Sequence, residues 1–171
     1  PRDEQFVYKA KTGRPCLGVL LKVISTDGKE VQSNDEEVGE IIVKGDTITQ
    51  GYWNKPEETE RAIQNGWLHT GDMAVVDSEG YVNIVDRKKD MIITGGENVY
   101  TIEVENALYT HPAVLEAAVI GLPDEKWGEA VKAVVVLKPG QTADADELIQ
   151  HCKSQIAHYK APKSIEFISE L

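Results

Sequence analysis

The chain has 171 residues, of which 41% are hydrophobic and 27% are charged. This is the composition of a soluble globular protein with one ordinary domain or two small ones, and it excludes a disordered chain, a collagen and a coiled coil. The net charge of −11 argues against nucleic acid as a partner, because proteins that bind it present a basic face to the phosphates.

The cysteine content and the hydrophobic runs bear on where the protein works. Cys16 and Cys152 are far apart and form no CxxC pattern, so we expect reduced thiols and a cytoplasmic location, with a disulfide as the alternative. The longest aliphatic run, residues 133–137, is far shorter than the ~20 residues of a membrane span. The N-terminus lacks the basic and apolar regions of a signal peptide. Because the chain begins and ends in the middle of a sequence pattern rather than at a recognisable terminus, we expect it to be a fragment of a longer protein.

The first half of the chain shows the pattern of strands and turns. The expected elements are a strand at 19–24, a strand at 39–44, a short helix beginning at 54–59, and a hairpin of strands 72–76 and 81–85. Pro56 and the acidic residues after it favour the start of the helix, and Gly66 is expected to end it. The hairpin turns at the Asp-Ser-Glu-Gly segment 77–80. This half therefore predicts a β-rich body.

The second half changes character and predicts a small α+β domain. The expected elements are a strand at 91–93, a helix at 101–109, strands at 114–121 and 130–137, a helix at 144–157 and a strand at 164–168. Thr101 is expected to cap the first of these helices, and Trp127 to be a packing residue. The order strand–helix–strand–strand–helix–strand is typical of an α+β unit. The charged stretch 86–90 is the natural boundary between the two halves.

Five motifs are more specific than this pattern. They are GWLHTGD at 66–72, DRKKDMIITGGENV at 86–99, HPAV at 111–114, GLPDEKWGE at 121–129 and YKAPK at 159–163. In this order they closely resemble the C-terminal part of the adenylate-forming enzymes, which include acyl- and aryl-CoA synthetases, peptide-synthetase adenylation domains and firefly luciferase. The resemblance covers the whole chain. Within this group, the motif around residues 86–99 is most similar to that of the fatty-acyl and aryl-acid CoA ligases.

The resemblance implies a two-step reaction and a two-domain enzyme. A carboxylate attacks the α-phosphate of ATP to give an acyl-adenylate and pyrophosphate, and the thiol of CoA then displaces AMP to give a thioester. A small C-terminal domain swings about a hinge between the two steps. By this resemblance residues 1–85 are the β-rich end of the large AMP-binding domain, residues 86–90 are the hinge, and residues 91–171 are the mobile α+β domain.

The resemblance also assigns three residues around the boundary. Asp72 matches the acidic residue that grips the ribose of the adenylate, and a carboxylate can accept hydrogen bonds from both ribose hydroxyls. Arg87 matches an arginine that reaches the same ribose. Lys89 matches the hinge position, where the backbone must change its torsion angles. The structural alternatives are a strand-edge aspartate that orders a turn and ordinary charged residues of a solvated linker.

Four further residues are expected to bind CoA. Gly95 and Gly96 match the loop that lines the tunnel for the pantetheine arm, and they are also residues that a tight turn would need. Lys160 and Lys163 match the region that meets the CoA nucleotide, where lysine can act as a phosphate partner. The alternative for both lysines is a solvated position beside the Ala-Pro of the YKAPK motif. The four histidines have no ligand spacing, so no metal site is assigned.

Other parts expected from the resemblance lie outside these residues. The phosphate-binding loop, which would hold most of ATP and its Mg²⁺, is expected upstream, and the catalytic lysine of the adenylation step is expected beyond Leu171. No catalytic residue is therefore assigned within the fragment, which alone should be inactive. The leading hypothesis is an ATP-dependent carboxylic acid–CoA ligase for a fatty or aryl acid. The alternatives are an adenylation domain that loads a carrier protein and a non-catalytic nucleotide- or CoA-binding module.

Overall fold

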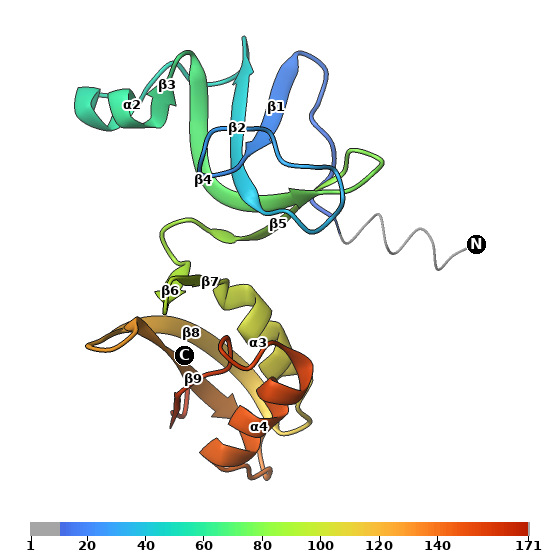
Figure 1. Cartoon of the computed structure of the whole chain (residues 1–171), viewed down its shortest axis with the longest axis vertical. Helices are drawn as coiled ribbons and strands as arrows, with labels where there is room; N and C mark the ends of the chain where they lie inside the picture. Colours follow the sequence, from blue (N-terminus) through green and yellow to red (C-terminus); the bar gives the residue numbers. More distant parts are fainter. Residues whose placement is uncertain (1–10, 171) are drawn as a thin grey trace. The chain divides into compact units, whose positions relative to one another are not determined.

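The computed structural model describes residues 11–170 (Figure 1). The chain divides into two compact units, Pro1–Lys88 and Lys89–Leu171, which we call the first and the second unit and describe separately. The division falls inside the charged segment 86–90 that the sequence marks as a boundary.

The first unit is a five-stranded antiparallel sheet. Its strands are β1 Val19–Ile24, β2 Gly39–Gly45, β3 Ile63–Gln64, β4 Trp67–Val76 and β5 Val82–Arg87. They are ordered β1-β2-β4-β3, with β5 paired to the second half of β4. The apolar residues of β1, β2 and β4 meet in a small core, which contains Val23, Ile41 and Ala74. This is the expected β-rich body.

Two element boundaries differ from the sequence prediction in this unit. The helix α2, Pro56–Ala62, ends four residues before Gly66, because Asn65 and Gly66 have φ of +53° and +77° and form the turn that joins β3 to β4. β4 begins at Trp67, well before residue 72. The polar and glycine-containing stretch 69–72 hides the strand pattern that Trp67 and Leu68 begin, and the pairing of residues 67–69 with β2 and β3 sets the start of the strand.

The second unit combines a sheet with two helices. Its elements are β6 Ile92–Thr94, β7 Glu97–Val99, α3 Thr101–Tyr109, β8 Val114–Asp124, β9 Gly128–Leu137, α4 Ala145–Gln155 and β10 Ser164–Phe167. The order in the sheet is β10-β9-β6-β7, with β8 also paired to β9, and the pair β9/β10 is parallel. The helices pack against the sheet and bury Leu108 and Leu148 completely (Figure 1). The α+β prediction is confirmed.

The second unit corrects three local expectations. Helix α3 is capped by Tyr100 without a side-chain hydrogen bond, and Thr101 is its first residue rather than its cap. Strand β7 was not predicted, because three residues with two polar side chains carry no clear strand pattern. The hairpin of β8 and β9 closes at residues 125–127, so both strands extend beyond their predicted ends at 121 and 130.

Candidate functional site

Asp72 and Arg87 are brought together in the first unit. They are directly opposite each other in the antiparallel pair of β4 and β5. The Nε of Arg87 donates a hydrogen bond to Oδ1 of Asp72 at 3.0 Å. The side chain of Asp72 is 25% exposed and that of Arg87 is 60% exposed, so the pair lies at the surface and is open to a ligand.

A bulge in β4 sets the position of Asp72. Met73 is opposite Glu40 and His69 is opposite Ile42, so β4 carries two more residues than β2 over this interval. Gly71 takes φ of +76° inside the bulge, a conformation that glycine adopts without strain. The hydroxyl of Thr70 donates to the carbonyl of Ile41 at 2.9 Å and accepts from the amide of Asp72 at 3.1 Å. The Thr-Gly-Asp sequence therefore forms a locally braced bulge, a feature that often re-aims side chains near functional sites.

The pair leaves hydrogen-bonding capacity unused. Within residues 11–170, Oδ2 of Asp72 and the terminal nitrogens of Arg87 make no further hydrogen bond. A carboxylate accepts and a guanidinium donates, so the pair offers an acceptor and donors side by side. Two neighbouring hydroxyl groups, each able to donate and accept, fit such an arrangement. As a plain surface ion pair it would contribute only about 0–1 kcal/mol to folding.

Lys89, the predicted hinge residue, is the first residue of the second unit. Its side chain has no ion pair or hydrogen bond with any residue of 11–170. Lys89 lines a cavity of about 350 Å³ in the second unit, together with Met91, Glu105 and Glu129. Two of its carboxylates hold the main chain: Glu129 accepts from the amide of Ile93 at 2.7 Å, and Glu105 accepts from the amide of Val119 at 3.0 Å.

Gly95 and Gly96 form the turn between β6 and β7, with φ of +62° and +85°. The amide of Gly95 donates to the carbonyl of Trp127 at 2.8 Å. A Cβ on Gly95 would lie 3.0 Å from Cε3 of Trp127, whereas a Cβ on Gly96 would meet nothing within 4 Å. The two glycines are thus different: Gly95 is packed beneath an indole ring, and Gly96 faces open space.

Trp127 is only partly the packing residue that the sequence predicts: its ring packs on Gly95, yet it is 43% exposed. Two ammonium groups approach its ring: Nζ of Lys126 lies 4.6 Å and Nζ of Lys163 lies 4.9 Å from the ring centroid. Asp124 accepts from the amides of Trp127 and Lys126, and these hydrogen bonds lower the pKa of its carboxyl group. The structure therefore joins Gly95, Trp127 and Lys163 into one exposed aromatic and cationic surface. The feature of the sequence that could have indicated this surface is a tryptophan between two predicted strands.

Lys160 has a different environment from Lys163. Its Nζ donates to both carboxylate oxygens of Glu103, at 2.8 and 2.7 Å, and its side chain is only 18% exposed. The ammonium is already neutralised by an acid of α3. Of the two lysines assigned to CoA, only Lys163 lies against the tryptophan; it forms no salt bridge within residues 11–170, and its charge acts on the nearby Asp124 carboxylate.

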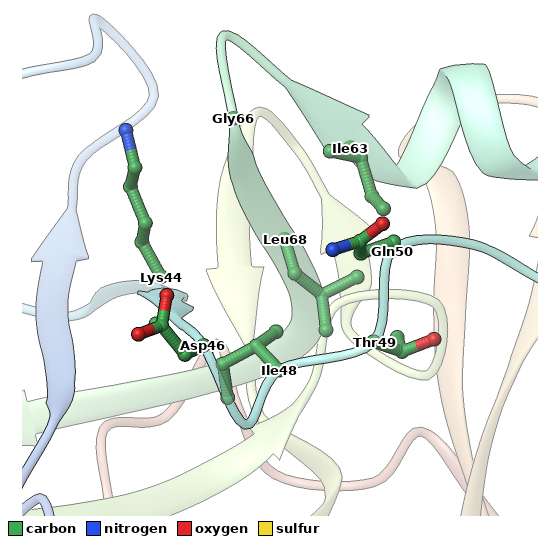
Figure 2. Close-up of a pocket in the computed structure, with 9 residues that line it drawn as sticks. Lys44, Asp46, Ile48, Thr49, Gln50, Ile63, Gly66 and Leu68 are labelled. Atoms are coloured by element: carbon green, nitrogen blue, oxygen red, sulfur yellow. The ribbon is translucent and has the colours of Figure 1, made fainter.

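A second cavity of about 380 Å³ lies in the first unit (Figure 2). Its apolar wall comes from Ile48 of the loop after β2, Ile63 of β3 and Leu68 of β4, and Lys44 and Asp46 stand at its rim. None of the predicted site residues lines this cavity. In residues 11–170 no three histidine, cysteine or acidic side chains gather as they would around a metal ion. No helix among these residues is long and apolar enough to cross a bilayer.

Comparison with known proteins identifies the family. Residues 103–171 match the model of the AMP-binding enzyme C-terminal domain. The chain is 53% identical over 159 residues to a feruloyl-CoA synthase of an Amycolatopsis species, which covers 93% of this chain and 32% of the relative. This chain belongs to the adenylate-forming, AMP-binding superfamily.

Other members of the superfamily agree in sequence and in fold. A long-chain-fatty-acid–CoA ligase of Bacillus subtilis strain 168 is 56% identical over 135 residues, which are 79% of this chain and 24% of that protein. The o-succinylbenzoate CoA synthetase of Bacillus subtilis, solved with its acyl-adenylate intermediate, superposes with a TM-score of 0.86 at 38% identity. That match covers 99% of this chain and 34% of the synthetase. The chain thus spans about a third of the length of the curated relatives it matches.

Proposed function

We propose that the chain is part of an ATP-dependent carboxylic acid–CoA ligase that first forms an acyl-adenylate and then transfers the acyl group to CoA. The observation that carries this proposal is the pair of Asp72 and Arg87, held in register at a braced bulge with an acceptor and donors turned to solvent. The named relatives, which are a feruloyl-CoA synthase and a fatty-acid–CoA ligase, support an aryl or fatty acid as the substrate.

In the first step we assign the Asp72–Arg87 pair to the ribose of ATP. The carboxylate of Asp72 accepts from the two ribose hydroxyls, and Arg87 donates to a ribose oxygen while it holds the carboxylate in place. Hydrogen bonds to a charged acceptor contribute about 1.5–3 kcal/mol each, enough to position the nucleotide. ATP enters as its Mg²⁺ complex, and most of the groups that hold the phosphates and the metal belong to parts of the ligase outside these residues.

In the second step we assign the exposed surface of the second unit to CoA. Gly96 leaves room for the pantetheine arm, because no atom lies within 4 Å of the place of its missing Cβ. Trp127 offers a face on which the adenine can stack, and Lys163 beside it offers a positive charge to a phosphate. Lys160, paired with Glu103, has a structural role in this assignment. Lys89 is the hinge about which the second unit turns between the two steps.

The decisive test is ATP use by the intact protein that carries these residues. With a panel of fatty and aryl acids, the wild type should release pyrophosphate and, when CoA is added, form the acyl thioester. Asp72→Asn keeps the shape of the side chain and removes its charge, so we expect the KM for ATP to rise at least about tenfold through loss of one charged hydrogen bond. Glu60→Gln, an exposed acid of α2, is the matched control and should leave the KM unchanged. An unchanged KM in Asp72→Asn would remove Asp72 from the nucleotide site.

The same assay distinguishes CoA from a carrier protein as the acceptor of the acyl group. Thioester formation with free CoA supports the CoA ligase, whereas acyl-adenylate formation with no transfer to CoA would favour a carrier protein as the acceptor. Failure of every acid to release pyrophosphate would leave only a nucleotide- or CoA-binding module. We place the enzyme in the cytoplasm, in keeping with the two cysteines, which are both free thiols.

A further inference from the structure

Glu40 is a buried acid that neither step of the proposed reaction uses. It lies on β2 and its side chain is only 10% exposed. A single oxygen, Oε2, is contacted by Nδ1 of His69 at 3.0 Å and by Nζ of Lys88 at 3.0 Å. Buried carboxylates are rare unless they are paired and hydrogen-bonded, so this cluster has a specific arrangement that needs a physical reason.

The cluster joins the end of the first unit to the middle of its sheet. Lys88 follows β5, and its amide donates to the carbonyl of Gly71 on β4 at 2.8 Å. Its side chain then reaches across β4 to Glu40 on β2. Lys88 is therefore held twice, by its main chain on the neighbouring strand and by its side chain on the strand beyond.

The negative charge of Glu40 favours the attachment of Lys88 to the sheet. Burial disfavours the ionised form of Glu40, but the hydrogen bonds from His69 and Lys88 outweigh that effect and lower the pKa of the carboxyl group. The carboxylate is thus charged at neutral pH. The side chain of Lys88 is itself 56% exposed, and if its ammonium leaves, the mostly buried Glu40 carboxylate keeps only His69 as its partner.

Lys88 is the last residue held in this way, and it is also the last residue of the first unit. Arg87 is held by Asp72, and its amide donates to Oδ1 of Asp86 at 2.7 Å. Lys88 is held by Glu40 and Gly71. The next residue, Lys89, is the first of the second unit, and its side chain has no partner among residues 11–170.

We propose that Glu40 is a positioning residue for the hinge, which holds Lys88 on the sheet so that backbone rotation starts at Lys89. The nucleotide grip then stays with the first unit when the second unit turns. Without the anchor, rotation could spread back into Arg87 and pull it away from Asp72. The catalytic consequence rests on the proposed function, whereas the anchoring itself does not.

The anchoring can be measured by hydrogen exchange and mass spectrometry of the protein, without any substrate. Lys88→Met keeps the aliphatic stem and removes the ammonium, and Lys89→Met makes the same change one residue later as the matched control. We expect peptides that cover residues 82–88 to exchange about tenfold faster in Lys88→Met and in Glu40→Gln. The same peptides should exchange at the wild-type rate in Lys89→Met, and peptides of β1 should accelerate much less than those of residues 82–88 in Lys88→Met and Glu40→Gln. This local pattern distinguishes an anchor from general unfolding.

Equal exchange of residues 82–88 in the wild type, Glu40→Gln and Lys88→Met overturns the inference, whatever the enzyme assays show. Acceleration of the same size in β1 and in residues 82–88 in both variants also overturns it, because Glu40 would then be only a stabilising residue. In the active ligase we expect Lys88→Met to slow thioester formation more than adenylation. If the wild type proves inactive with every acid, the proposed function fails while the exchange result still decides the anchoring.

Discussion

The two units differ in how their residues are held in place. In the second unit, two helices and several strands meet in a large buried cluster that includes Ile92, Val104, Leu108 and Leu148. In the first unit the buried cluster is smaller and contains Val23, Val31, Ile41, Ala74 and Val82. The order at the end of the first unit comes instead from ion pairs. The second unit therefore rests on a larger buried core than the first.

The largest expected effect comes from the connection between the units. Lys89→Pro locks φ at the proposed hinge, so for the ligase proposed above we expect adenylation to persist while thioester formation falls at least about a hundredfold, as expected when a required domain motion is blocked. The two half-reactions are measured separately, as pyrophosphate release and as thioester formed from preformed adenylate. Equal loss of both half-reactions would show that Lys89 is not a hinge and that the two units act as one.

The difference between the cores predicts a difference in stability. Leu148→Ala removes a fully buried side chain of α4 and should destabilise the second unit by about 2–5 kcal/mol. In the wild type we expect the second unit to be better protected from hydrogen exchange than the first. Exchange as a function of denaturant measures both quantities. Comparable protection of the two units in the wild type would contradict the comparison.

The neighbouring glycines of the second unit offer a finer test. Each has positive φ, so alanine at either position introduces backbone strain of about 1–2 kcal/mol. Only Gly95→Ala also forces Trp127 to move, since the new Cβ would lie 3.0 Å from its ring. We expect a lower unfolding temperature and a change in tryptophan fluorescence in Gly95→Ala relative to Gly96→Ala. Identical behaviour of the two variants would mean that Trp127 does not pack on Gly95.

The ion pairs of the first unit predict a dependence on pH. Because the pKa of Glu40 is lowered on folding, its charged form stabilises the first unit above the unfolded value of about 4.5, and this stabilisation is lost as the pH falls through the lower folded value. Glu40→Gln should flatten the fall in stability between neutral pH and this acid range, and Glu60→Gln should not. Urea unfolding at a series of pH values measures the slope. An unchanged slope in Glu40→Gln would contradict the ion-pair account.

The smallest effect concerns the two cysteines, one in each unit. Cys16 is exposed, whereas burial raises the pKa of the Cys152 thiol to about 11. A thiol reagent at pH 8 should therefore modify one thiol at once and the other only when the second unit opens. Simultaneous reaction of both thiols in native buffer would contradict the buried core of α4.

The sequence predicts local features better than distant contacts. The hairpin turn at residues 77–80 and a helix close to α4 could be predicted, because both depend on neighbouring residues; the structure makes Asp144 the cap of α4 rather than its first residue. The pairing of Glu40 with Lys88 could not be predicted, since 48 residues separate them and only the sheet brings them together. The exposure of Trp127 was missed for the same reason: its neighbours Gly95 and Lys163 come from distant segments.

For Asp72 and Arg87, the candidate nucleotide pair, the sequence motif and the structure each contributed a separate part of the assignment. The Thr-Gly-Asp motif indicated Asp72 through the resemblance, and the bulge explains physically why these residue types are needed there. The resemblance also indicated Arg87, and the strand register places it directly opposite Asp72. The structural role of Lys160 could be recognised only in the structure, because nothing in the local sequence indicates its pairing with Glu103.

The anchoring of Lys88 has a consequence for proteolysis. Arg87, Lys88 and Lys89 are three consecutive targets for trypsin-like enzymes, yet proteases cut chain that can leave its hydrogen bonds and extend into their active site. The first two residues are held by strand and ion pair, so the bond after Lys89 is the one exposed to cleavage. The most easily cut bond would then coincide with the proposed hinge. Brief digestion should separate the two units and leave the Asp72–Arg87 pair whole on the first.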